Sequence, residues 1–205
     1  KTLKNINKKR IYAMLFHHSS DIFINKKSFL KTELKNSKFK KIGVSIYDPI
    51  EIYKVIKIPQ IQVIQIPFNI LDFRWQEHIK RIQSIKHDLG IEIHARSCFL
   101  QGLLLSTRIK DWEKRGIMQH KKILKWLTNQ TSTIRRQSIA DLCLAYVRSQ
   151  SWIDSVVIGV DNMKELNENI KLFKLPILNI DDLKKIELSR PRVKENILNP
   201  TTWSN

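Results

Sequence analysis

Apolar positions along the chain alternate between short continuous runs and longer segments with helical spacing. The short runs predict five strands, at 10–16, 41–47, 60–68, 91–96 and 155–160, and the run at 60–68 is dense in β-branched residues. The longer segments carry apolar residues three and four positions apart and predict helices at 26–38, 49–57, 76–89, 119–128, 137–149, 163–173 and 181–188. Pro49 suits a first helical turn, and Gly90 suits the residue that follows a helix.

At least one helix separates each predicted strand from the next, which is typical of parallel βα units with right-handed crossovers. The fold class is therefore α/β. Two arrangements remain, an open doubly wound sheet and part of a (β/α)₈ barrel. The chain contains neither a GxGxxG nor a GxxxxGK[ST] phosphate-binding pattern, and their absence favours the barrel.

One segment breaks the alternation. The stretch SCFLQGLLLSTRIKDW at 97–112 is apolar but has no regular period, and it is predicted to be a loop. Loops of this length are often functional. Composition supports a buried core, because 42% of the 205 residues are hydrophobic. Cys98 and Cys143 each lie in an apolar run, so we expect them to be buried and to form neither a disulfide nor a metal site.

The net charge of +18 is concentrated near the start, where residues 1–41 hold 12 basic and 2 acidic residues. The chain has no zinc-finger spacing, no RNP-like strand and no arginine-rich arm, so we interpret the charge as a solvated surface and expect no specific nucleic acid partner. No apolar run approaches the ~18 residues that cross a bilayer, and the polar opening KTLKNINKKR lacks the apolar core of a signal peptide. We therefore expect no membrane partner and a cytoplasmic location.

In a barrel, the site is built at the carboxyl ends of the strands. The polar residues and glycine at those positions are His17, His18, Ser45, Gln65, Asn69, Arg96, Ser97 and Gly159. Side chains alternate along a strand, so at most one of the two adjacent histidines faces the interior. Gly159 precedes a predicted helix with Asn162 as its N-cap and Glu165 three residues on. This turn suits either a bound phosphate or an ordinary helix cap.

Five segments together resemble the aldo-keto reductases. MLFHH, KIGVS, VIQIPFNILD, ARSCFLQGLLL and VVIGVDNMKELNEN are similar to the fourth to eighth strands of that family, in order, from Ile11 to Phe173. The resemblance implies a partial (β/α)₈ TIM barrel, made of strands 4 to 8 with their helices. Residues 1–205 would form a single C-terminal portion of such a barrel, with 175–205 as its C-terminal helix and tail.

Matched by position, the resemblance implies that His17 is the catalytic histidine that polarises the substrate carbonyl. Ser45 and Gln65 would hold the carboxamide of the nicotinamide. Arg96 stands where the family has an aromatic residue under the nicotinamide ring. A guanidinium plane can stack on a ring, although its charge opposes an oxidised nicotinamide.

The remaining cofactor contacts implied by the resemblance lie later in the chain. Ser97 would face the pyrophosphate, Gly159 would meet phosphate, and Glu168 and Asn169 would face the adenine end. The cofactor would be NADP or NAD. Many family members place a basic residue for the 2′-phosphate of NADP in the stretch 160–165, where this chain has Asp161 and Glu165.

The implied function is NAD(P)H-dependent reduction of an aldehyde or ketone, with a small-molecule carbonyl substrate that is sugar-related. The family's first three βα units carry the catalytic Asp, Tyr and Lys, which have no counterpart in this chain, so we expect the enzyme to be truncated here. A second chain that supplies the missing strands is the protein partner we expect. The alternative is a non-catalytic partial barrel that binds a nucleotide or a partner protein.

Overall fold

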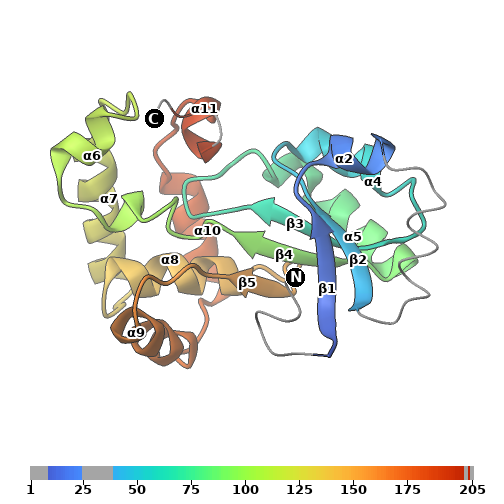
Figure 1. The fold of residues 1–205 in the computed structure, drawn as a ribbon. Coiled ribbons are helices and arrows are strands. Elements are labelled where there is room, and N and C mark those ends of the chain that lie inside the picture. Colours follow the sequence, from blue (N-terminus) through green and yellow to red (C-terminus); the bar gives the residue numbers. More distant parts are fainter. Residues whose placement is uncertain (1–8, 25–38, 201–202, 204–205) are drawn as a thin grey trace. The chain divides into compact units, whose positions relative to one another are not determined.

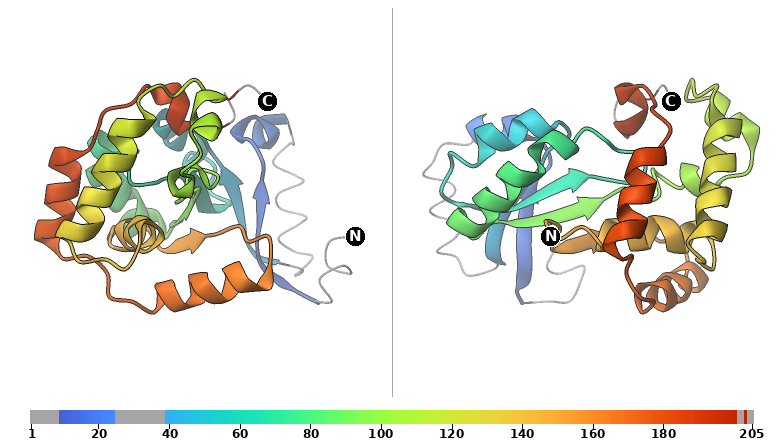
Figure 2. Two further views of the ribbon diagram at one scale, coloured as in Figure 1. Left: turned by 90° about the vertical axis from the view of Figure 1, so that its left-hand side faces the viewer. Right: turned by 180° about the vertical axis from the view of Figure 1, so that it is seen from behind.

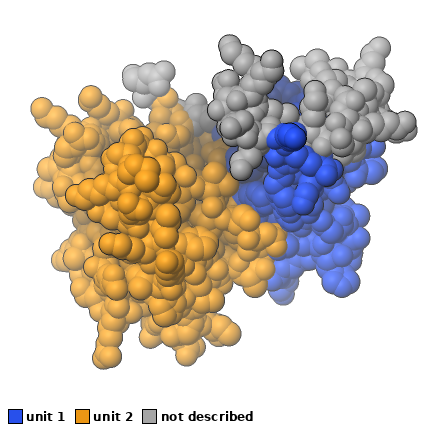
Figure 3. Space-filling model, turned by 60° about the horizontal axis from the view of Figure 1, so that its bottom comes forward, with its two compact units in different colours: residues 1–66, 77–94 blue, residues 67–76, 95–205 orange. Residues whose placement is uncertain are grey.

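The structure is a computed structural model, and it describes residues 9–24, 39–200 and 203. The chain divides into two compact units, coloured separately in Figure 3. The first unit comprises residues 1–66 and 77–94, and the second unit comprises residues 67–76 and 95–205. The helix predicted at 26–38 lies outside the described residues.

The strands follow one another in the sheet in chain order (Figure 1). They are β1 (Ile11–Phe16), β2 (Phe39–Ser45), β3 (Ile61–Pro67), β4 (Glu92–Arg96) and β5 (Ser155–Val157). β1 pairs with β2 and β2 with β3 in parallel. A doubly wound sheet reverses its strand order at a switch point, whereas successive units of a barrel add strands in sequence. The α/β class is confirmed, and the strand order agrees with the barrel and not with the open sheet.

The helices of the chain include several short ones. Those up to β4 are α2 (Ser19–Ile24), η1 (Pro49–Glu51), α4 (Ile52–Val55), η2 (Gln76–His78) and α5 (Ile79–Leu89). Seen from the front and from behind, α4 and α5 cover the same face of the first unit's strands (Figures 1 and 2). Gly90 ends α5 with a φ of 63°, and its amide donates to the carbonyl of Lys86, as predicted.

The second unit contains the remaining helices. They are η3 (Leu103–Leu105), α6 (Ile109–Glu113), α7 (His120–Thr133), α8 (Ile139–Arg148), α9 (Met163–Phe173), α10 (Ile180–Ser189) and α11 (Glu195–Leu198). Within the described parts of the chain, no helix is both long enough and apolar enough to cross a membrane.

Two strands end earlier than predicted. β2 ends at Ser45 and not at residue 47, because the carboxylate of Glu51 accepts the amide hydrogen of Tyr47. β5 ends at Val157, beyond which Ile158 and Gly159 line a cavity instead of continuing the strand to residue 160.

The segment 97–112 was expected to be a loop throughout, but it contains η3 and begins α6. The side chains of Ser106 and Arg108 donate to the carboxylate of Asp111 in the first turn of α6. These local hydrogen bonds stabilise a short helix that the irregular apolar spacing does not predict.

The core of the first unit is dominated by isoleucine from the strands and from α5. Ile42, Ile64, Ile82 and Ile93 are fully buried. At Gly43 the strands approach too closely for a side chain, because an added Cβ would lie 2.4 Å from the carbonyl oxygen of Val63. A glycine is therefore required at this position of the β2–β3 pair, where the register of the two strands shifts.

A carboxylate connects strands that are not neighbours in the first unit. Glu92 on β4 accepts hydrogen bonds from Tyr12 on β1 (2.5 Å) and from Lys41 on β2 (2.6 Å), and His94 Nε2 lies 3.1 Å from its second oxygen. Strands lie ~4.8 Å apart, so a flat sheet would separate β1 from β4 by roughly 14 Å. The contact between Tyr12 and Glu92 therefore shows that this part of the sheet is curled.

The second unit has an aromatic core. Phe68 packs on Tyr146 (ring centroids 5.7 Å apart) and edge-on to Trp152 (5.1 Å), and Trp152 stacks on Trp75 (6.2 Å). The indole of Trp75 donates to the carbonyl of Pro67, which satisfies the polar atom of a fully buried ring. Cys98 and Cys143 are buried free thiols in this unit, as predicted.

Two buried arginines attach the last helices to residue 72. Asp72 accepts from Arg74 through Nε (3.0 Å) and Nη2 (2.6 Å), and Arg190 at the end of α10 donates to the carbonyl of Asp72 (2.7 Å). Arg74 also reaches the carbonyl of Leu198 in α11. Burial raises the pKa of Asp72 against the opposing effect of Arg74. This network fixes α10 and α11 against the segment 67–76.

The first prediction concerns Glu92. Partial burial opposes its ionisation, but the hydrogen bonds from Lys41, Tyr12 and His94 outweigh burial and lower the pKa of Glu92 from 4.5 to about 2. A pKa that is depressed on folding contributes stability above the unfolded value, and that stability is lost as the pH falls through the folded value. We expect Glu92→Gln to lower the free energy of unfolding at neutral pH by about 1 kcal/mol.

The difference between Glu92→Gln and the parent chain should shrink as the pH falls from about 4.5 towards 2, as measured by urea unfolding at each pH. The same substitution at the exposed Glu113 is the control and should have little effect at any pH. A difference that does not change with pH would contradict the proposed role of the ionised carboxylate.

The second prediction concerns the buried pair of Asp72 and Arg74. Asp72→Ala leaves the Arg74 guanidinium, whose side chain is 8% exposed, without its carboxylate. We expect a loss of about 3–5 kcal/mol in the free energy of unfolding. Lys185→Ala, which removes a surface ion pair with Asp182, should cost less than about 0.5 kcal/mol. Similar losses for the two variants in urea unfolding would show that the buried pair contributes no more to the free energy of unfolding than the surface pair does.

Candidate functional site

Three aromatic rings gather at the carboxyl ends of β1 and β2. The Nδ1 atom of His17 lies 2.8 Å from Nε2 of His18, and their ring centroids are 4.3 Å apart. Tyr47 stacks on His18 at 5.5 Å and meets His17 edge-on at 6.4 Å. His17 is exposed to solvent. When Nδ1 accepts the Nε2 hydrogen of His18, Nε2 of His17 carries its own hydrogen and can donate it to a substrate oxygen.

Glu51 fixes the two segments that carry these rings. Its carboxylate accepts hydrogen bonds from the Ser19 hydroxyl, which follows the histidines, and from the amides of Tyr47 and Asp48. Partial burial opposes ionisation, but these hydrogen bonds prevail and lower the pKa of Glu51. Asp48 in turn accepts the amide hydrogen of Ile50, which completes a capping box at the start of η1. The end of β1 is thereby attached to the turn that follows β2.

Ser45 and Gln65 lie next to each other on the paired strands β2 and β3. The register places Ser45 opposite Gln65, and the Ser45 hydroxyl lies 3.4 Å from the Gln65 amide oxygen. Ser45 is buried and Gln65 is half-buried. The family resemblance implies that this pair is the carboxamide site, and the two side chains can offer a hydroxyl and an amide to one planar group.

The turn after β4 has an unusual backbone. Ser97, Leu100, Gln101 and Gly102 all have positive φ angles, between 48° and 79°. Left-handed backbone is costly for residues other than glycine and is found where the surrounding structure imposes it. Arg96 immediately precedes this turn, and its guanidinium lies 3.4 Å from the Ser97 hydroxyl. The strained turn is therefore a specific feature of the site and not a relaxed connection.

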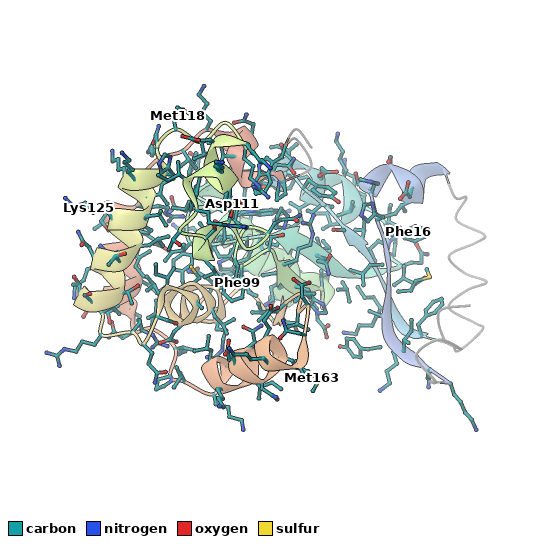
Figure 4. All side chains as sticks on the ribbon, turned by 60° about the vertical axis from the view of Figure 1, so that its left-hand side comes forward. Phe16, Phe99, Asp111, Met118, Lys125 and Met163 are labelled. Carbon is teal, nitrogen blue, oxygen red and sulfur yellow. The ribbon has the colours of Figure 1, made fainter. Side chains whose placement is uncertain are left out.

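One cavity of about 580 Å³ lies wholly within the second unit. It contains four of the predicted cofactor residues, Ser97, Gly159, Glu168 and Asn169, which come from three separate segments of the chain. The turn after β4 forms one wall and α9 forms another. Figure 4 shows Phe99 on that turn and Met163 on the first turn of α9. Arg96 does not belong to the lining.

The wall formed by α9 follows from local sequence. Asn162 caps the helix by accepting the amide hydrogen of Glu165 (2.9 Å), as predicted. Glu165, Glu168, Asn169 and Leu172 are spaced three and four residues apart, so they lie on one helical face, and all four line the cavity.

Several features of the site were not predicted from the sequence. Tyr47 was not singled out, although it lies two residues beyond the predicted site residue Ser45. Ala140 and Leu172 line the cavity without having been predicted. The helical spacing from Glu168 points to Leu172, whereas Ala140 is brought in from α8 by tertiary packing. Asn69, which was a strand-end candidate, is fully buried and accepts the amide hydrogen of Leu71, so it stabilises a turn.

Comparison with solved structures supports the fold. The aldo-keto reductase AKR11C1 from Bacillus halodurans, in its holo form, matches with a TM-score of 0.73 at 19% identity, covering 94% of this chain and 63% of that protein. The glycerol dehydrogenase AKR11B4 from Gluconobacter oxydans matches with a TM-score of 0.67 at 15% identity, covering 91% and 60%. The chain thus spans less than two thirds of the length of these structures, and its strands form a partial (β/α)₈ barrel.

Comparison with curated protein sequences finds no significant match. The sequence profile of the Aldo/keto reductase family, however, matches residues 16–189, which is most of the chain. The match includes every candidate site residue from His17 to Asn169. The chain belongs to the Aldo/keto reductase family.

Proposed function

We propose that the chain is the C-terminal portion of an oxidoreductase that uses NADH or NADPH to reduce an aldehyde or ketone. The observation that carries the proposal is the cavity of the second unit, where Ser97, Gly159, Glu168 and Asn169 meet. Its volume is in the range of ligand sites. A sugar-related or polyol-related substrate is part of the proposal, and one solved relative is named as a glycerol dehydrogenase.

The residues of the cavity fit a dinucleotide. A Cβ added to Gly159 would meet no atom within 4 Å, so the bare backbone at this position faces open space into which a ligand can pass. The N-terminal turn of the 11-residue helix α9 begins four residues later, at Met163, and favours negative charge. In the proposal, Ser97 and Gly159 hold the phosphates, and Glu168 and Asn169 hold the adenosine end.

The remaining proposed roles belong to the ends of β1 to β4. A bound nicotinamide cofactor supplies the hydride. Ser45 and Gln65 would hold its carboxamide, Arg96 would take the place of the family's aromatic residue under the ring, and His17 would donate a hydrogen bond to the carbonyl oxygen of the substrate. These 205 residues include no counterpart of the family's Asp, Tyr and Lys, so the acid that protonates the product oxygen must come from outside them. Residues beyond this sequence, or a partner chain that supplies the missing strands, would provide it.

A valine at position 159 tests the cofactor site. Its side chain would occupy the space through which a phosphate approaches, without striking any protein atom at Cβ. We expect Gly159→Val to weaken the binding of the reduced cofactor by tenfold or more, as measured by the change in cofactor fluorescence on titration with the full chain. Gly159→Ala should have a smaller effect, and Thr128→Val, at an exposed position on α7, should have none. Unchanged binding by Gly159→Val would argue against a cofactor at this turn.

A fusion protein tests the catalytic role of the chain. We expect the 205 residues alone to oxidise NADH or NADPH with aldehydes and sugars ~10²–10⁴-fold more slowly than a fusion with the first three βα units of a related reductase, because they lack the general acid. In the fusion, His17→Ala should reduce turnover, whereas His18→Ala should retain more of it. Full turnover by the unfused chain would show that its site contains an acid of its own.

A further inference from the structure

The helix α9 lies within the described residues and is amphipathic, yet none of its eleven residues is buried. Its apolar residues Met163, Leu166, Ile170 and Phe173 are spaced alternately three and four positions apart, so they form one stripe along the helix. Met163 is 68% exposed, and Ile170 and Phe173 are each 46% exposed. Helices in proteins are stabilised mainly by the packing of such a stripe. The stripe of α9 is therefore a face that a further element can cover.

The neighbouring helix α8 covers the stripe incompletely. α9 lies at the periphery of the second unit (Figures 1 and 2). α8 reaches the last residue of the stripe, where the guanidinium carbon of Arg148 lies 4.4 Å from the centroid of the Phe173 ring. Met163, labelled in Figure 4, and Ile170 lie further around the helix. These two side chains form the most accessible part of the stripe.

The strand that precedes α9 is also incompletely covered. β5 is the last strand of the sheet and pairs with β4, so its other edge has no partner strand among the described residues. Val157 at the end of β5 is 42% exposed, and Val160 just beyond it is 40% exposed. Strands of a parallel sheet are normally buried on both faces. β5 and α9, which follow one another in the chain, thus share an open side.

An open strand edge and an exposed helix stripe in one βα unit fit one kind of occupant. In a barrel, each strand pairs with the next strand and each helix packs beside the next helix. The occupant is therefore a strand parallel to β5, followed by an amphipathic helix with its own apolar stripe. A lone helix or a lone strand would cover only half of this surface. The solved relative AKR11C1, of which this chain covers 63%, is long enough to contain such a unit.

We propose that the free edge of β5 and the apolar stripe of α9 form one docking surface, which binds the first βα unit of a partner chain. The inference rests on the proposed function, in which the missing strands come from outside these 205 residues. It adds the place and the contacts by which the partner joins. The partner's strand hydrogen-bonds to β5, and its helix covers Met163 and Ile170. Because another face of α9 lines the cavity, docking also holds that wall in place.

Co-expression with a separate partner chain tests the docking surface. The partner used is the first three βα units of AKR11C1 from Bacillus halodurans, produced together with the full 205-residue chain. We expect the two chains to copurify as a one-to-one complex, as measured by light scattering. Amide hydrogen exchange at 155–157 and 163–173 should slow at least tenfold in the complex, whereas exchange in α6 should not change.

A charge in the stripe should weaken the complex. Ile170→Glu should reduce the affinity at least tenfold in a dilution series, because docking would bury the carboxylate. Ile109→Glu is the matched control, since Ile109 is 45% exposed on α6, and it should leave the affinity unchanged. Met163→Glu provides a second test if Ile170→Glu fails to fold, because an acidic residue is favourable in the first turn of a helix.

The outcomes separate the docking surface from the proposed function. No complex, a complex with unchanged exchange in β5 and α9, or one that tolerates both stripe variants would overturn the inference. A dimer of the 205-residue chain alone that Ile170→Glu dissociates would also overturn it, because a second copy would then cover the stripe. Cofactor titration of the same complex tests the proposed function. A complex that binds neither NADH nor NADPH would overturn that function and leave the docking surface standing.

Discussion

The ionised carboxylate of Glu92 is the interaction on which the arrangement of the first unit depends. It joins β4 to β1 and β2 through Tyr12 and Lys41, across strands that a flat sheet would keep apart. The parallel strands β1, β2 and β3 end at one edge of this curled sheet. His17, Ser45 and Gln65 belong to that edge. Glu51 fixes the segments that follow β1 and β2. One carboxylate, Glu92, therefore joins the strands, and a second, Glu51, joins the turns beyond them.

The second unit forms its cavity by a different combination of forces. The face of α9 is determined locally, by the Asn162 cap and by the helical spacing of Glu165, Glu168 and Leu172. The opposite wall is a turn with four positive φ angles, which only the surrounding packing can maintain. Leu100 in this turn and Leu104 just beyond it are fully buried, which anchors the turn in the second unit. The cavity therefore combines a wall that forms by local preference with one that the tertiary structure imposes.

Charge is unevenly distributed around the cavity of the second unit. Arg96 ends β4, next to Ser97 but outside the cavity lining, whereas the carboxylates of α9 face the cavity. Family membership follows from the match over residues 16–189. It does not fix which side chains bear charge at the turns, because these positions do not contribute to the core.

The sequence by itself determined the elements whose signals are local. The strands lie where the short apolar runs predict them, and α9 spans 163–173 as predicted. Gly90 ends α5 in the left-handed conformation, which a residue without a Cβ adopts at little cost. Parallel pairing and the burial of both cysteines also follow from the pattern of apolar runs, whereas that pattern left the strand order open between a barrel and a doubly wound sheet. Ser45 and Gln65 were predicted as a pair, and four predicted cofactor residues share one cavity. Their roles stay predictions.

Only the tertiary structure decided the features that depend on contacts between distant residues. α2 and α11 are too short for a periodic signal. α7 continues to Thr133, beyond the predicted end at residue 128. Trp126 and Gln130 of this helix donate hydrogen bonds to Ser189 at the end of the adjacent α10 (Figure 2). The cluster around Glu92 joins residues 80 positions apart in sequence. Such contacts have no local signature, because their energy arises only when folding brings the partners together and removes them from water.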